Sequence, residues 1–583
     1  MYFFVFLLSF ILFTLFIFSY GFFFKKVFFK NSEISFGEIG IFGFVLLYFI
    51  SLIFHFIIPL SNFLIFGLWV FAVVNIYINY KHFFFIIKKN ISFLFLFFFF
   101  FVISLTTSLH DDVNLYQMQI INYMQNFKII FGISSLNDYL GYGHSFYEIM
   151  AFFKVPFYGN NFVFLVPVIF SFFFITFLFQ KIKEKESKFI YSFAIIILIL
   201  FFLKFTRSKE YGTDIVVFCS IAILQIYFLD FIQSKKFLNF YKFAIIFSFA
   251  IFSKLYAAYA VIYLVIFIYY FLKNFKNEKL RFPIIVFLFL FCFLSIIKNL
   301  INTGCAFYPA YQTCFDNKKY IPWSLTKDIA KDRNEFLRAA SRGWKAYIRT
   351  TDGKKIVTAK DYLEISKYNY PKYLTKDPDF ERFIILISII FIVSLIFIFD
   401  SHTKIKNNQK SLMLFSNKNF LILLCLSFVP VFLWFFNSPH MRYGGYNYLA
   451  LFGSIIASNF LNVENFSKNK IKILIILSII FCFSKNLKRI YEEYSSSNEF
   501  PKIVFDKFEY DYFFKNNVKI IYPKKALYCG NIKQICASDK NLIYKIYEKY
   551  GYFVIIPNKI ALKKFIYETS IFENYLLNDI KVK

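Results

Sequence analysis

Apolar runs close to 20 residues long dominate this sequence and limit what it can fold into. A run of that length, coiled as an α-helix, spans the hydrocarbon core of a lipid bilayer. About fourteen runs meet this length criterion, near 2–24, 38–59, 62–80, 91–108, 161–180, 189–204, 212–231, 238–252, 256–272, 282–300, 382–399, 419–436, 443–461 and 471–485. Only 17% of the 583 residues are charged, too few to cover a soluble protein of this size. We therefore predict an all-α polytopic membrane protein, with the lipid bilayer as its first partner.

Lysine and arginine are distributed unevenly between the loops that join these runs. The loops after the odd-numbered runs hold 24 of these residues, whereas the short loops of the other parity hold four, namely Arg207, Lys209, Lys254 and Arg442. Cytoplasmic loops carry an excess of positive residues. The pattern predicts a multi-pass protein of the bacterial inner membrane with both termini outside the cytoplasm. Because the basic charge is mostly topological, we expect no nucleic-acid partner.

This topology divides the chain into three membrane blocks and three outer segments. The membrane blocks are 1–108, 161–300 and 382–485, and the outer segments are 109–160, 301–381 and 486–583. In the last segment, the alternating stretches "VKIIYP" and "GYFVIIP" predict strands, and "NLIYKIYEKYG" predicts a helix that stops at its glycine. We expect the tail to be a small α/β module.

The first outer segment begins with an amphipathic pattern. Apolar residues recur there at intervals of three and four, which places them on one face of a helix: Val113, Tyr116, Ile120, Met124 and Phe127. A helix of this kind beside a span is expected to lie along the membrane surface. A second short helix is predicted at "FYEIMAFF", and a third over 325–340 in the next outer segment.

Two pairs of closely spaced cysteines also fall in outer segments, Cys305 with Cys314 and Cys529 with Cys536. Disulfides persist in oxidising compartments outside the cytosol. We predict that each pair closes a small disulfide loop, the alternative being four unrelated thiols.

The adjacent carboxylates Asp111 and Asp112 follow the fourth apolar run and have His110 beside them. One carboxylate can cap the amphipathic helix. The other is then available as a general base or as a ligand of a divalent cation such as Mg²⁺ or Mn²⁺. We favour Asp111 as the reactive group and Asp112 as the cap. No other cofactor is indicated.

Further polar residues stand at the outer ends of other runs. Asp214 begins the run near 212–231, where it either complements the helix dipole or supplies a third catalytic carboxylate. Arg442 lies beside His440 in "SPHMRYGG", and an arginine next to glycines suits the binding of a phosphate group.

Four more residues are candidates for substrate binding, Lys298, Arg207, His144 and His440. Each has a plainer alternative. A lysine at the end of a span can extend its ammonium group to the membrane interface, and a lone histidine is more often a solvated side chain than a catalyst.

The stretches "HDDVNLYQMQIINYMQNF", "NTGCAFYP" and "SPHMRYGGYN" resemble a group of bacterial membrane proteins of unknown activity with GT-C-like helices. The acidic pair followed by an interfacial helix also resembles membrane glycosyltransferases of the GT-C class. This resemblance implies a GT-C-like fold and an outer aspartate that acts as base or metal ligand, which maps onto Asp111 or Asp112, with a later acidic residue at Asp214. The chain departs from the usual GT-C layout because its acidic segment follows the fourth run instead of the first.

These features predict an inner-membrane glycosyltransferase that moves a sugar from a polyprenyl-phosphate donor to a cell-envelope glycan or lipid acceptor on the outer face. Cationic side chains would stabilise the phosphate leaving group, and an aspartate would deprotonate the acceptor hydroxyl. The alternatives are a polysaccharide polymerase or ligase, a transporter, and a non-catalytic envelope-assembly protein.

Two observations disfavour other functions. Walker A, GxSxG, HExxH and CxxC motifs are absent from the sequence, which removes support for ATP hydrolysis, a serine hydrolase or a zinc protease. Few charges lie in the middle of the apolar runs, which disfavours a transporter. The glycosyltransferase prediction carries one geometric expectation: Asp111 or Asp112, Asp214 and Arg442 should face one outer cavity.

Overall fold

The fold is described by a computed structural model. The structure describes residues 2–571 except 31, 143–144, 156–157, 185–186, 210–211, 275–280, 317–318, 351–356, 368, 377, 403–417, 461–467, 497–499, 525 and 527.

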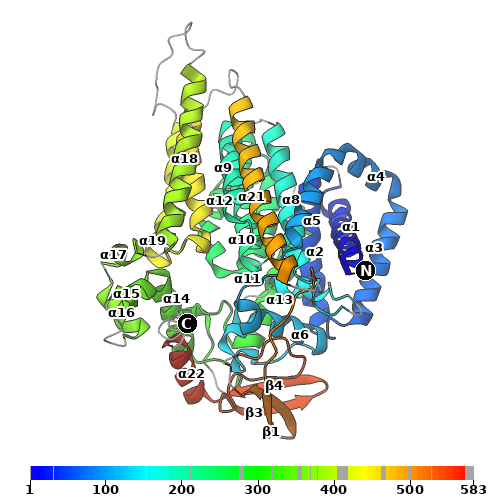
Figure 1. The fold of residues 1–583 in the computed structure, drawn as a ribbon, viewed down its shortest axis with the longest axis vertical. Coiled ribbons are helices and arrows are strands. Elements are labelled where there is room, and N and C mark those ends of the chain that lie inside the picture. Colours follow the sequence, from blue (N-terminus) through cyan, green and yellow to red (C-terminus); the bar gives the residue numbers. More distant parts are fainter. Residues whose placement is uncertain are drawn as a thin grey trace.

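Long apolar helices make up the greater part of the molecule (Figure 1). They are α1 (Tyr2–Phe28), α2 (Phe36–His55), α3 (Asn62–Ile78), α4 (Tyr80–Lys89), α5 (Leu94–Ser104), α8 (Leu165–Glu184), α9 (Lys188–Lys204), α10 (Thr213–Ser234), α11 (Phe237–Ser253), α12 (Val261–Asn274), α13 (Phe282–Thr303), α18 (Pro378–His402), α19 (Lys418–Asn437), α20 (Tyr446–Ser458) and α21 (Lys468–Ser496). Each apolar run of the sequence falls on one of these helices.

Among the described residues, seven of these helices are long and apolar enough to cross a membrane. The bent pair α3 and α4, which turns by 83°, makes an eighth if it counts as one span. The other helices of the bundle are shorter or, like α21, carry more charge. The protein is therefore a mostly helical membrane protein, and the number of fourteen spans stays a prediction.

Glycines allow the first two helices to approach each other closely. A Cβ atom added to Gly21 on α1 would lie 1.7 Å from the backbone oxygen of Ile39, and one added to Gly43 on α2 would lie 2.1 Å from that of Ile17. Only hydrogen fits at these two positions, so the backbones of α1 and α2 touch. Small residues play this role between membrane helices because lipid supplies no hydrophobic force to press the helices together.

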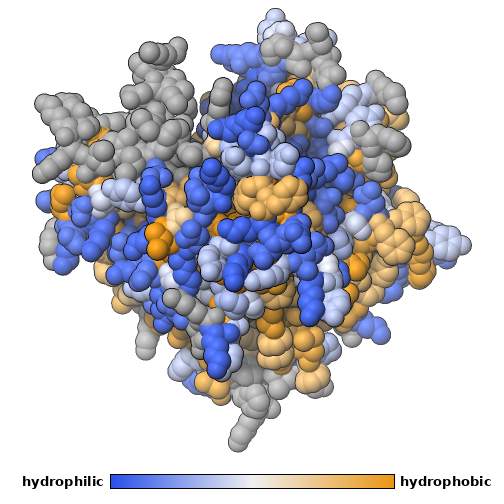
Figure 2. Space-filling model, turned by 90° about the horizontal axis from the view of Figure 1, so that it is seen from below, coloured by the Kyte–Doolittle hydropathy of each residue, from blue (hydrophilic) through white to orange (hydrophobic). Residues whose placement is uncertain are grey.

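The outer segments of the chain supply shorter elements, which gather at one end of the bundle. These are α6 (Met118–Asn126), α7 (Ser145–Ala151), α14 (Lys327–Ser341), α15 (Trp344–Thr350), α16 (Ala359–Ile365), α17 (Tyr370–Leu374), β1 (Tyr510–Lys515), β2 (Val518–Pro523), β3 (Ile543–Lys549), β4 (Tyr552–Pro557) and α22 (Lys559–Ile571). Figure 1 shows them at the lower end, opposite α4. Seen from that end, much of the surface is hydrophilic (Figure 2).

The expected amphipathic helix exists, but it does not lie exposed on a membrane surface. A π-helical turn, η2 (Val113–Gln117), leads into α6, and every residue of α6 from Met118 to Gln125 is buried. Its polar side is covered by the C-terminal segment, because the Asn122 side chain donates to that of Asn531 at 2.9 Å and the Gln119 side chain donates to the Cys536 carbonyl at 2.9 Å. The polar face contacts protein instead of water.

The C-terminal module contains two antiparallel hairpins, β1–β2 and β3–β4. The strands at "VKIIYP" and "GYFVIIP" are as predicted, but the predicted helix at "NLIYKIYEKYG" is wrong: this stretch forms β3. Ile543 and Ile546 of β3 are buried, and the turn places Tyr550 and Gly551 at positive φ. Such a turn joins two strands tightly, and the apolar strand β4 then supplies the pairing partner.

Both cysteine pairs form disulfides, Cys305 with Cys314 and Cys529 with Cys536. The second loop docks on the amphipathic helix. The Tyr123 hydroxyl accepts from the Cys536 backbone N–H at 2.8 Å and lies 3.1 Å from the carbonyl oxygen of the same residue. The C-terminal module is thus attached to the segment that follows His110.

We expect Tyr123→Phe to weaken this attachment. The substitution leaves the buried Cys536 N–H without its acceptor, at a cost of about 1–3 kcal/mol in unfolding free energy. Thermal unfolding of the detergent-solubilised protein measures this loss of stability. Tyr550→Phe is the matched control, since Tyr550 is 82% exposed. Equal melting temperatures for the two variants would contradict the proposed attachment.

Candidate functional site

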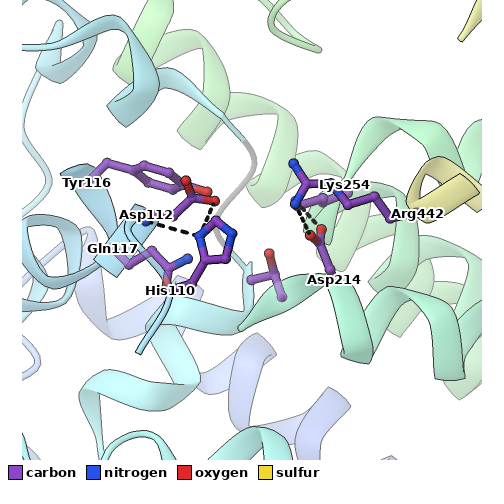
Figure 3. Close-up of a pocket in the computed structure, with 8 residues that line it drawn as sticks. His110, Asp112, Tyr116, Gln117, Asp214, Lys254 and Arg442 are labelled. Carbon is purple, nitrogen blue, oxygen red and sulfur yellow. Dashed lines mark hydrogen bonds and ion pairs between the residues drawn. The ribbon is translucent and has the colours of Figure 1, made fainter. Parts of the chain in front are cut away.

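A polar cleft lies at the lower end of the bundle, where four distant parts of the chain meet (Figure 3). The first outer segment contributes one wall, and the start of α10 contributes another. The remaining wall comes from the junction after α11 and from the turn η9 (Met441–Gly445) before α20. The lining residues are His110, Asp112, Tyr116, Gln117, Thr213, Asp214, Lys254 and Arg442. The expectation that Asp112, Asp214 and Arg442 face one cavity agrees with this arrangement.

On one side of the cleft, Asp112 and His110 form a pair. The His110 Nδ1 atom lies 3.4 Å from the Asp112 carboxylate and 3.1 Å from the Asp112 backbone nitrogen. These two contacts need different states of the imidazole, because Nδ1 accepts from the N–H only when it carries no proton. The ion pair with the carboxylate forms when Nδ1 is protonated. Protonation of His110 therefore changes the bonding of Asp112.

The surroundings of the pair favour its charged form. The hydrogen bond to Asp112 raises the pKa of His110 above its ordinary 6.5, against the opposing effect of burial. Burial would raise the pKa of Asp112, but His110, Arg442 and Lys254 outweigh it and hold that pKa below 3.8. The pair therefore contributes its full stabilisation between pH 3.8 and pH 6.5, the ordinary pKa values of the two groups. This stabilisation declines as the pH rises through the raised pKa of His110 or falls through the lowered pKa of Asp112.

On the opposite side, Asp214 lies between two cations. Its carboxylate forms an ion pair with Lys254, and the Arg442 guanidinium lies 4.0 Å away. Asp214 stands in the first turn of α10, where the helix dipole also favours a negative charge. Figure 3 shows His110 between Asp112 and this second group. The cleft therefore joins a carboxylate–imidazole pair to a carboxylate that holds two cations.

The turn that carries Arg442 is fixed by local contacts. The His440 Nδ1 atom accepts from the Arg442 backbone N–H at 3.4 Å, and the Trp434 indole donates to the His440 carbonyl at 3.0 Å. Gly444 adopts φ +91°, and a Cβ there would lie 2.6 Å from the Tyr448 ring. The glycines of "RYGG" thus make room for the protein's own aromatic side chains.

Backbone contacts also fix the segment that leads into the cleft. The Glu493 carboxylate on α21 accepts from the N–H and the hydroxyl of both Thr107 and Ser108. From the other side, the buried Lys209 ammonium donates to the carbonyls of Ser104 and Thr106, at 3.0 and 2.6 Å. One carboxylate and one ammonium thus hold four residues of the stretch from Ser104 to Ser108, shortly before His110.

The other predicted site residues lie outside the cleft. Asp111 and Arg207 are exposed in two turns, and neither lines the cleft. Lys298 is buried and forms an ion pair with Glu148, whose side chain is fully buried on α7. His440 does not line the cleft; its imidazole accepts from the Arg442 backbone N–H and so stabilises the turn. His144 lies outside the described residues.

The structure contradicts the capping role expected for Asp112. Asp112 precedes η2, but its side chain makes no capping hydrogen bond, so the expectation that Asp112 caps the helix is wrong. A turn directs this side chain toward His110 and the cleft instead. Within the described parts of the chain, no three His, Cys, Asp or Glu side chains are grouped to hold a metal ion. A cation at Asp111 and Asp112 stays a prediction.

Five lining residues were not predicted as site residues: His110, Lys254, Tyr116, Gln117 and Thr213. His110 was noted only as the neighbour of the acidic pair. Lys254 had a usable signal, because it is one of four cations in the short loops of the outer parity. Tyr116 was assigned to the apolar face of the helix, and it is buried at 7% exposure while still bordering the cleft. Gln117 and Thr213 carry no such signal, since polar residues near a helix start are common.

Comparison with known families gives one match. Residues 3–450 match the family described as a domain of unknown function, DUF8201. The chain belongs to this family. The DUF8201 region contains every residue that lines the cleft, whereas Glu493 and the C-terminal module lie beyond it. No curated protein and no solved structure matches the chain.

We expect Glu493→Gln to loosen the entry to the cleft. A glutamine retains one acceptor oxygen but turns an N–H₂ group toward the donors of Thr107 or Ser108. Losing charge-assisted hydrogen bonds should speed amide exchange of these residues roughly tenfold or more. Hydrogen exchange of the full chain in detergent measures the exchange rates of the Thr107 and Ser108 amides. Glu492→Gln is the neighbouring control, because Glu492 pairs with Lys488 on the exposed surface; equal exchange in both variants would overturn the assignment.

Asp112→Asn should lower the pKa of His110, because the hydrogen bond to the carboxylate is the largest cause of its rise. Labelled histidine in the full chain allows the imidazole to be titrated by NMR, with the resonance assigned from a His110→Gln variant. Asp111→Asn removes the same charge one residue earlier and should shift the pKa less, since Asp111 contributes least of the causes. An equal shift of the His110 pKa in both variants would contradict the pairing of Asp112 with His110.

Proposed function

We propose that this protein is a glycosyltransferase that moves a sugar from a polyprenyl-phosphate donor to a cell-envelope glycan or lipid acceptor. The proposal places the cleft at the outer face of the bacterial inner membrane, with fourteen spans, a GT-C-like arrangement and both termini outside. One observation carries it: a carboxylate–imidazole pair faces a carboxylate that holds Lys254 and Arg442, at the end of the bundle where the large outer segments gather.

The cation side of the cleft suits a phosphate leaving group. Arg442 presents a planar guanidinium, which binds phosphate through two parallel hydrogen bonds, and Lys254 adds a second positive charge. Asp214 keeps both cations in place before a substrate binds. A lipid-linked phosphate would reach this position along the bundle, with its hydrocarbon tail in the bilayer and its charge at the helix ends.

The opposite side suits deprotonation of an acceptor hydroxyl. In the proposed step, the acceptor oxygen attacks the anomeric carbon while the bond from that carbon to the phosphate oxygen breaks. The hydroxyl proton passes to the His110 imidazole, and Asp112 orients the ring and stabilises the imidazolium. Polyprenyl phosphate leaves with the electron pair, and Arg442 and Lys254 stabilise its charge. A single displacement of this kind inverts the anomeric carbon.

A transfer assay tests the proposal. Purified protein receives a panel of radiolabelled polyprenyl-phosphate hexoses and pentoses together with an envelope extract as acceptor. We expect Asp112→Asn to lower the transfer rate about 100-fold or more, because the His110 base loses the carboxylate that orients it and stabilises its imidazolium. Arg442→Ala should lower the rate to a similar extent, because the leaving group loses an electrostatic stabiliser.

Asp111→Asn and Arg207→Ala are the matched controls, because each removes the same chemistry from an exposed position outside the cleft. They should retain the wild-type rate. If wild type releases no sugar from any carrier, or if all four variants transfer at one rate, the protein is not this kind of enzyme.

A further inference from the structure

The hairpin β3–β4 presents one face on which lysines and tyrosines alternate. In the strand register, Lys549 lies opposite Tyr552, and Tyr547 lies opposite Val554. Lys545 lies on the same face two residues from Tyr547, and the Lys128 ammonium stands 4.6 Å from the centre of the Tyr552 ring. We call Lys128, Lys545, Tyr547, Lys549 and Tyr552 the lysine–tyrosine face.

Tyr547 and Lys549 of this face are exposed and Lys128, Lys545 and Tyr552 are half-buried, while the other side of the hairpin is packed around two isoleucines. Ile546 and Ile555 form a directly opposed pair on the other side and are both fully buried. Tyr547 is 42% exposed. Glu548 is the one acidic residue of the two strands, and the alternation of the strand directs it to the other side. The lysines of the face therefore have no carboxylate among the side chains of their own face.

The hairpin is also held firmly. Phe131, which follows α6, pairs with Val554 in a parallel bridge, and the Phe131 N–H donates to the Phe553 carbonyl at 2.9 Å. The Tyr552 hydroxyl donates to the Phe56 carbonyl at the end of α2 at 2.7 Å. A ligand that binds this face therefore meets a preformed surface.

We propose that the lysine–tyrosine face binds an anionic glycan. Tyrosine combines a flat apolar ring with a polar tip, so the exposed Tyr547 ring can pack on the C–H face of a sugar while its hydroxyl stays solvated. Lysines spaced along the strand attract the carboxylate or phosphate groups of such a chain. The face lies away from the cleft, and the proposal goes beyond the transferase activity because binding there needs no catalysis.

Other anionic occupants are separated from a glycan by the test. The hairpins lie at the lower end of the molecule (Figure 1), but Tyr552 of the face contacts the end of α2. Equal binding of anionic lipid vesicles would therefore overturn the proposal. The lysine-rich loops at the opposite ends of the helices predict that this end faces outward, where nucleic acid is not the expected ligand.

Retention on an immobilised polyanionic glycan tests the proposal. The detergent-solubilised full chain is passed over polygalacturonate and over neutral dextran in 0.1 M salt. We expect retention on polygalacturonate only. Lys545→Ala combined with Lys549→Ala should weaken binding roughly tenfold or more, since two charge-assisted contacts are lost, and Tyr547→Ala should weaken it several-fold.

Matched controls separate this face from general positive charge. Lys488→Ala combined with Lys564→Ala removes two lysines that are 77% and 74% exposed elsewhere, and Tyr491→Ala removes a ring that is 74% exposed. Both controls should bind like wild type. If they weaken binding equally, or if Tyr547→Ala has no effect, the surface attracts polyanions by charge alone and the proposal is overturned. Equal binding of an oligonucleotide or polyglutamate would overturn it too.

Discussion

A helix that faces lipid cannot keep an unpaired charge, and this constraint determines where the molecule can place chemistry. Two described pairs of buried opposite charges join helices of the bundle. Glu38 on α2 binds Lys242 on α11 at 2.7 Å, and Glu148 on α7 binds Lys298 on α13. Removing one partner of such a pair leaves a buried charge and costs several kcal/mol, on the order of 3–5. The pairs therefore fix how the helices sit against one another, and polar side chains accessible to a ligand gather at the helix ends.

The charges that line the cleft are also held by opposite charges. Asp214, Lys254 and Arg442 come from three places far apart in the sequence, and their mutual attraction brings the start of α10, the end of α11 and the turn before α20 together. An anionic group that enters the cleft can take over the role of Asp214 as partner of the two cations. The site is thus a charge cluster that is stable without a ligand and can exchange one anion for another.

The sequence allowed part of this site to be predicted. Asp112, Asp214 and Arg442 could be placed in one cavity because the charge of the loops gave each helix end its side, and cations are rare on that side. Which of Asp111 and Asp112 faces the cleft could not be predicted. The two residues lie at a turn, where helical periodicity does not tell the direction of a side chain. Lys298 looked available because its partner, Glu148, lies 150 residues earlier in a segment whose contacts no local pattern records.

The burial of α6 and the formation of β3 were missed for a related reason. A polar helix face looks solvated until the covering segment is known, and here that segment lies more than 400 residues later, around Asn531 and Cys536. The stretch "NLIYKIYEKYG" supports a helix as well as a strand by composition, and the pairing with β4 decides between them. Long-range pairing overrides local preference in strands more than in helices.

The part of the chain beyond the DUF8201 region has a structural role in the cleft. Glu493 holds Thr107 and Ser108 on one side of His110, and the Gly530 N–H donates to the Asn114 carbonyl at 3.1 Å on the other. The residues between these two anchors include His110 and Asp112. The same outer segment, further along at Phe131, pairs with β4 and so carries the lysine–tyrosine face. One continuous stretch, from Thr107 to Phe131, therefore connects that face to the cleft, and its geometry at both ends is set by contacts from the C-terminal region.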